Sequence, residues 1–157
     1  MAYIDVISLT TAKNWLKIDD TLTADDTLIT GLINSVCSYI EKRTNHLFYA
    51  RSKNYRFYDY CVEVYDYPIN SLTTPTDAES TDFELYTLYE TNSSDDKILT
   101  LNVGYENATD IPPELIDCAL YLIDWLYYGK EDKKTLNSLS IPRPIMLMID
   151  ANKRYII

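Results

Sequence analysis

The stretch TADDTLITGLINSVCSYIEKRT, residues 23–44, predicts a long amphipathic helix from about Ala24 to Thr44. Thr23 is a suitable N-cap, and two aspartates in the first turn interact favourably with the positive end of the helix dipole. The apolar residues recur in an i, i+1, i+4, i+5 pattern on one face: Leu28, Ile29, Leu32, Ile33, Val36, Cys37 and Ile40. A single apolar stripe of this kind is typical of a helix that faces the core.

A second apolar helix is predicted over residues 112–129, PPELIDCALYLIDWLYYG, because proline suits the first helical position and glycine the residue after the last. Its main stripe consists of Leu115, Ile116, Ala119, Leu120, Ile123 and Leu126. A further stripe at i, i+4 and i+7 consists of Tyr121, Trp125 and Tyr128. A helix this apolar is buried on more than one side. It is either a central core helix or one shared with a neighbouring subunit, and the second option makes these three aromatic residues candidates for a subunit interface.

The two long helices are expected to pack on each other and to bury four side chains almost fully: Leu32, Val36, Leu120 and Ile123. A shorter helix is predicted from Leu9 to Ile18, with Ser8 as its N-cap. After a polar link at residues 130–140, Ile145–Ile149 forms a short apolar segment.

Residues 53–105 have a different pattern, with short β-branched and aromatic runs that favour strands. YPINSL, residues 67–72, is interpreted as the end of a strand that leads into a turn. Residues 92–96, NSSDD, are interpreted as a turn that joins Asp82–Glu90 and Lys97–Val103 in a hairpin. The expected fold is mainly α within the α+β class: a small helical bundle with an inserted β-hairpin or small antiparallel sheet and an extended C-terminal tail.

We expect one domain over residues 1–157. Its helical core covers about 8–52 and 110–150, the β-rich insert about 53–105, and the tail 152–157. With 157 residues, 46% of them apolar, the chain is long enough to build one core. The N-terminus does not resemble a secretory signal, and no apolar run approaches the roughly 18 residues of a membrane helix.

The formal charge of −10 argues against binding to nucleic-acid phosphates or to an anionic membrane surface. The three cysteines, Cys37, Cys61 and Cys118, form no CxxC motif and are expected to be reduced and buried, which favours synthesis in a reducing cytoplasm. The acidic stretch Asp77–Asp96 is interpreted as a solvated loop face.

No motif for catalysis or for cofactor binding is found in the sequence. Three glycines cannot build a P-loop or a dinucleotide fingerprint. The single histidine, His46, follows the first long helix and is interpreted as a C-terminal helix cation or a plain surface residue. The acidic residues lack the alternating ligands and the turn glycine of a calcium loop. We therefore assign no catalytic, cofactor or metal residue and expect no enzyme.

Several segments resemble, in their order and spacing, the head–tail connector family of tailed bacteriophages. These are SLTTAKNWLKID at 8–19, DDTLI at 25–29, YPINSL at 67–72, VGY at 103–105, DIPPELIDCA at 110–119 and WLY at 125–127. Ile141-Pro142 and the late basic Arg154 are similar to the C-terminus of that family. Each motif alone is a helix-cap or turn signature, so the order carries the resemblance.

The resemblance implies a structural protein of the virion neck, assembled in the host cytoplasm. Similar proteins form a dodecameric ring below the portal protein, extend the DNA channel and give a tail-side neck or tail protein a docking face. DNA would pass through without specific binding, and no cofactor or membrane is implied. Whether the acidic insert faces the channel or the outside is left open.

The C-terminal tail is expected to contact the portal. Its apolar end would gain free energy from burial in a partner groove, and its two basic residues could pair with acidic groups there. The residues assigned to this contact are Lys153, Arg154, Tyr155, Ile156 and Ile157. The alternative is that the tail folds back on its own subunit over Ile145–Ile149.

Other functions remain open at this stage. The chain could be another neck or tail structural protein. Its fifteen tyrosines could also form a stacking surface in a binding module for a small ligand or peptide. A minor enzyme with a carboxylate site is a further alternative.

Overall fold

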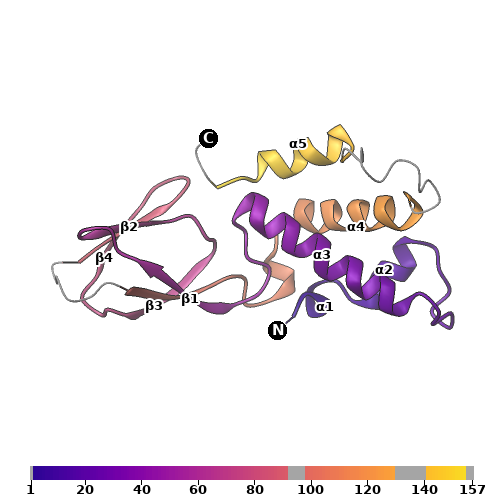
Figure 1. Ribbon diagram of the computed structural model, residues 1–157, viewed down its shortest axis with the longest axis horizontal. Coiled ribbons are helices and arrows are strands. Elements are labelled where there is room, and N and C mark those ends of the chain that lie inside the picture. The colour runs from indigo at the N-terminus through magenta and orange to yellow at the C-terminus, as the bar shows by residue number, and fades with distance from the viewer. Residues whose placement is uncertain (1, 92–97, 130–140, 155–157) are drawn as a thin grey trace.

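Two long helices, α3 (Asp26–Thr44) and α4 (Pro113–Tyr128), lie side by side in the computed structural model, which describes residues 2–91, 98–129 and 141–154. The shorter helices α1 (Tyr3–Val6), α2 (Leu9–Trp15) and α5 (Arg143–Ala151) pack against this pair. All the strands lie at one end of the helices, so the molecule has a helical part and a β part (Figure 1).

The helical core lies where α3 and α4 meet, as the apolar stripes predict. Val36, Leu120 and Ile123 are 2%, 6% and 0% exposed, which confirms the prediction for these three residues. The prediction is wrong for Leu32, which is only partly buried because it lies at the edge of the stripe. Ile145 and Ile149 of α5 are buried in the same core.

The helix ends show which capping predictions hold. The Ser8 hydroxyl oxygen accepts a 3.0 Å hydrogen bond from the Thr11 backbone N–H, which confirms Ser8 as N-cap of α2. Thr23 is not the N-cap of α3; that position belongs to Asp25, and the buried ammonium of Lys13 lies 2.6 Å from Asp26 in the first turn. α2 ends three residues before the predicted Ile18, and Lys17 beyond it has a positive φ of 58°.

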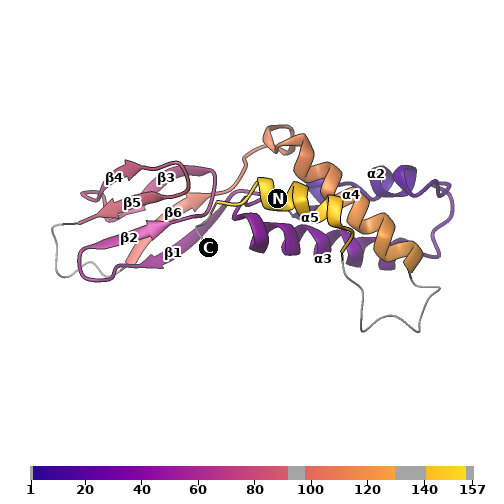
Figure 2. The same ribbon diagram turned by 90° about the horizontal axis from the view of Figure 1, so that it is seen from above.

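The strands form two antiparallel three-stranded sheets, seen from above in Figure 2. One has the order β1-β6-β3, from β1 (Arg51–Arg56), β6 (Ile98–Val103) and β3 (Ile69–Thr74). The other has the order β2-β5-β4, from β2 (Cys61–Val64), β5 (Thr87–Glu90) and β4 (Glu79–Asp82). A second apolar core lies within the β part and includes Leu47, Phe57, Val64, Tyr89, Leu99, Leu101 and Val103.

Two predictions about the strands are wrong. Asp82–Glu90 and Lys97–Val103 do not form a hairpin, because β5 pairs with β2 and β4 whereas β6 pairs with β1 and β3. β6 is a central strand, since every second side chain in it is fully buried. YPINSL does not end a strand either. Tyr67-Pro68 precedes β3, and the strand begins at Ile69.

The connection between the β part and the helices needs a glycine. Gly104 follows β6 with a φ of +109°, and a Cβ there would collide with the backbone carbonyl of Tyr49. Its N–H donates to the Pro68 carbonyl oxygen and its own carbonyl accepts from the Asn70 side-chain amide, each at 2.7 Å. The backbone directly after β6 therefore packs against the backbone directly before β1.

The expected fold class, mainly α with an antiparallel β insert, is confirmed, and the insert consists of two sheets. Cys37 and Cys118 are buried free thiols as predicted, but Cys61 is exposed because it opens β2 on the outer side of its sheet. The predicted turn at 92–96, the link at 130–140 and the end of the tail at 155–157 lie outside the described residues.

Candidate functional site

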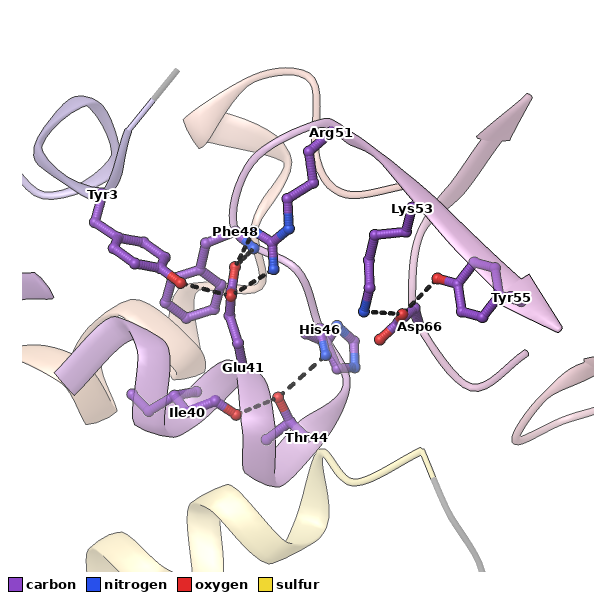
Figure 3. Close-up of polar contacts among 10 residues, drawn as sticks. All are labelled: Tyr3, Ile40, Glu41, Thr44, His46, Phe48, Arg51, Lys53, Tyr55 and Asp66. Carbon is purple, nitrogen blue, oxygen red and sulfur yellow. Dashed lines mark hydrogen bonds and ion pairs between the residues drawn. The ribbon is translucent and has the colours of Figure 1, made fainter. Parts of the chain in front are cut away.

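A buried carboxylate fastens the helices to the β part. Glu41, 5% exposed on the last turns of α3, accepts four hydrogen bonds (Figure 3). The Tyr3 hydroxyl donates at 2.6 Å, the Phe48 backbone N–H at 2.7 Å, and the Arg51 guanidinium at 3.1 and 2.8 Å. These donors come from α1, from the loop after α3 and from β1. One side chain therefore fixes three segments at the junction.

A second ion pair lies beside it. Lys53 of β1 and the Tyr55 hydroxyl both donate to the carboxylate of Asp66, a residue that is itself buried (Figure 3). Burial, together with the hydrogen bond to Asp66, raises the pKa of Tyr55 above its ordinary value, so the phenol stays protonated. This pair joins β1 to the loop before β3.

His46 is buried at the same junction, contrary to the expectation of a helix cation or a surface residue. The imidazole Nδ1 lies 2.8 Å from the Tyr105 hydroxyl, and the two rings are stacked. Burial, and then the nearby Arg154, lowers the pKa of His46 to about 4. The imidazole is therefore neutral at physiological pH and acts as a hydrogen-bonding core residue.

The tail leaves the helices at this junction. The backbone N–H of Arg154 donates to the Thr44 carbonyl at 3.1 Å, and the Arg154 carbonyl accepts from the Asn45 side-chain amide at 3.3 Å. Its guanidinium lies 4.3 Å from the centre of the Tyr67 ring, within cation–π range. Lys153 pairs with Asp150 at 2.5 Å. Both basic residues assigned to the portal contact therefore have partners within the chain.

The three aromatic residues assigned to a subunit contact lie on α4 but differ in exposure. Tyr121 and Tyr128 are 47% and 54% exposed, whereas Trp125 is partly buried. The Tyr121 ring meets Trp15 edge to face at 5.1 Å, and the Tyr128 hydroxyl donates to the Leu16 carbonyl at 2.6 Å. Both tyrosines therefore expose ring surface while α2 holds them in place.

Trp125 lines a hollow of about 300 Å³ between α3, α4 and the start of α5. The walls are almost entirely apolar and consist of Ser35, Val36, Tyr39, Leu122, Trp125, Leu126 and Ile141. This apolar hollow therefore lies on the helical part.

The described residues offer little for chemistry. Ranges 2–91, 98–129 and 141–154 contain no group of three or more His, Cys, Asp or Glu side chains placed to hold a metal ion. No helix among these ranges is long and apolar enough to cross a membrane. Burial raises the pKa of the thiols to about 12 for Cys37 and about 11 for Cys118, so neither forms a thiolate nucleophile at neutral pH.

Sequence reasoning did not find Glu41 or the buried role of His46. Both residues come near or after the end of the apolar stripe of α3, where the sequence is typical of a solvated helix end. No regular spacing in the sequence connects Glu41 with Tyr3 or His46 with Tyr105.

Comparisons with known proteins agree on one relationship. The family described as "Phage gp6-like head-tail connector protein" matches residues 6–153. None of the curated proteins matches the chain. A chain of the "Virion of native gene transfer agent (GTA) particle" is similar with a TM-score of 0.75 and 11% identity, over 100% of this chain and 94% of the other.

Two further solved structures are similar. A chain from the "Neck of empty GTA particle computed with C6 symmetry" has a TM-score of 0.74 and 12% identity, covering 97% and 91% of the two chains. A chain from the "Neck of native GTA particle computed with C12 symmetry" has a TM-score of 0.66 and 11% identity, covering 96% and 93%. At these identities the likeness shows a shared fold over nearly the full length of both chains.

Proposed function

The chain belongs to the phage gp6-like head–tail connector family, and we propose that it is a ring-forming structural subunit of a virion neck. The observation that carries the proposal is the extent of the family match, which spans both the helical part and the β part. The fold shared with chains from neck structures of C6 and C12 symmetry supports it. The proposal includes no catalytic step and no cofactor.

The ring would be built from copies of this chain, with a dodecamer as the expected state. Exposed aromatic rings are enriched at protein interfaces, and α4 presents two of them, Tyr121 and Tyr128. The apolar hollow beside Trp125 gives a second surface that a neighbouring subunit could fill. Ring closure needs two different surfaces on each copy, and these surfaces are distinct.

The portal contact is assigned to the tail, with different roles for its residues. Arg154 is held by Thr44, Asn45 and Tyr67, so it would fix the point and direction in which the tail leaves the subunit. Tyr155–Ile157 would supply the apolar side chains that enter the portal. β-branched residues favour an extended form, and an extended segment can add a strand to a sheet edge of a partner.

The ring would lie between the portal and a tail-side neck or tail protein, and DNA would pass through it. The net charge of −10 opposes retention of phosphates, so passage without specific binding is expected. The location is then the neck of a virion assembled in the host cytoplasm.

Deleting Tyr155–Ile157 tests the portal contact, because the cut leaves every described contact of Arg154 in place. We expect the truncated chain to unfold at the wild-type temperature and to form rings, but to lose co-sedimentation with portal-bearing heads. Arg154→Ala is the companion variant, because it removes the contact of the Arg154 guanidinium with the Tyr67 ring and keeps the last three residues. Normal attachment of the truncated chain would contradict the assigned contact.

Light scattering separates this proposal from the binding-module alternative. A connector forms rings alone or with the portal protein. A chain that stays monomeric in both conditions and binds a small ligand or a peptide would instead support the module.

A further inference from the structure

The outer face of the sheet β2-β5-β4 is acidic and largely exposed among the described residues. Side chains alternate across a sheet, and Val64 and Tyr89 point into the core of the β part. The register then places a row of Cys61, Glu90 and Glu79 and a row of Glu63, Leu88 and Thr81 on the opposite, solvent side. Of these, Glu63, Glu79 and Glu90 are exposed.

Among the described residues, no cation forms an ion pair with these carboxylates. Residues 57–91 contain no lysine or arginine, and the cations that flank this range in sequence are Arg56 and Lys97. Glu79 and Glu90 also face each other across neighbouring strands, where like charges repel. A cationic partner surface would relieve this repulsion.

Aromatic rings border the same face. Tyr60 is 56% exposed and lines a hollow of about 460 Å³ together with Glu79, Glu90 and Thr91. The hydroxyl of Tyr65 donates to Glu63 at 2.7 Å. Carboxylates beside the face of a tyrosine suit a lysine or arginine side chain, which can pair with the charge and stack on the ring.

The complementary surface occurs on the same chain, at the C-terminal end of α3. Lys42 is exposed and Arg43 partly exposed, and neither forms an ion pair among the described residues. The Arg43 guanidinium lies 5.9 Å from the centre of the Tyr39 ring. Attraction to the helix dipole favours cations at this position, and a carboxylate of a neighbouring copy could form an ion pair with them.

We propose that, in the ring, the outer face of β2-β5-β4 of one subunit packs against the Lys42–Arg43 end of α3 in the next. The two surfaces differ and are both present on every copy. The contact is therefore heterologous and propagates from copy to copy until the rotation closes a ring. The inference rests on the proposed function, because it requires a ring.

Charge reversal tests this contact in the full-length chain. In the double variant Glu79→Lys with Glu90→Lys, the sheet face and the end of α3 are both basic, and the two facing side chains still carry like charges. In the double variant Lys42→Glu with Arg43→Glu, the sheet face and the end of α3 are both acidic. Lys42→Glu alone is a milder version of this second reversal. Glu106→Lys with Asp20→Lys is the matched control, since both residues are exposed and lie on neither surface nor on α4. Thermal unfolding checks that each variant folds.

Mass photometry measures the concentration at which rings form. Each reversal should raise that concentration about tenfold or more, because like charges then face each other, whereas the control should not change it. Rings should return in the fourfold charge-swapped variant and in an equal mixture of the two reversed variants, which can alternate around an even-numbered ring. Added salt should weaken wild-type assembly.

The outcomes separate the two claims. The proposed contact is wrong if the reversed variants fold and assemble like the wild type. It is also wrong if the fourfold charge-swapped variant folds but does not recover ring formation. Neither result would count against the proposal that the chain forms a ring. If the isolated wild-type chain is monomeric, the same variants are scored by subunits bound per portal-bearing head. A wild-type chain that assembles in neither setting refutes the proposed function itself.

Discussion

Replacing Glu41 tests how the junction is held together. Glu41→Ala leaves the fully buried Phe48 with an unpaired backbone N–H, which costs about 1–3 kcal/mol. It also leaves the Arg51 guanidinium without its carboxylate, and breaking a buried ion pair costs about 3–5 kcal/mol. The Arg51 side chain is 27% exposed and water can solvate it, so we expect the lower end of the combined cost, about 4 kcal/mol.

The assay is equilibrium unfolding in urea together with thermal unfolding. In a chain of this length each kcal/mol shifts Tm by about 2–4 °C, so Glu41→Ala should lower Tm by roughly 10 °C. Glu41→Gln keeps an oxygen acceptor for Phe48 and should cost about half as much. Glu106→Ala, at an exposed position, is the control and should leave Tm unchanged. A Glu41→Ala variant within about 1 kcal/mol of wild type would refute this account of the junction.

Three further predictions concern the core, the histidine and DNA. Ile123→Ala should lower the free energy of unfolding by about 2–5 kcal/mol, and Leu32→Ala by less than half of that, in urea titrations; equal losses would contradict the burial described here. The folded-state pKa of His46, about 4, lies below its ordinary value of 6.5, so the unfolded chain takes up a proton first as pH falls. Stability should therefore be full above pH 6.5 and decline toward pH 4, and His46→Gln should flatten the part of the curve above about pH 5, where few carboxylates titrate. Duplex DNA should not bind at micromolar concentration in physiological salt; a saturating fluorescence-anisotropy titration there would show that the acidic surface does not exclude phosphates.

The helices could be predicted from the sequence because their signals are local. The apolar stripe that predicts α3 consists of residues of that helix, at spacings of one to five positions. The proline and the glycine that predict the ends of α4 lie at those ends. Leu32 shows the limit of this reasoning, since a stripe says which face is apolar and not where its edge meets the next helix.

The strand pairing could not be predicted in this way. β5 and β6 are neighbours in sequence, and a short polar segment between two apolar runs usually indicates a hairpin. Their true partners are set by burial: Leu99 and Leu101 are fully buried in a central strand that needs β1 and β3 on either side. The contacts at Glu41 and His46 join residues far apart in the chain, so no local pattern could reveal them.

Image reconstruction of portal-bearing heads completed with this chain would show directly whether the chain forms a ring at the neck. We expect a closed dodecameric ring of the chain directly below the portal, with the helical and β parts resolved in each subunit and an open channel along the axis. Density for the chain elsewhere in the particle, or a single copy without ring symmetry at the neck, would contradict this expectation.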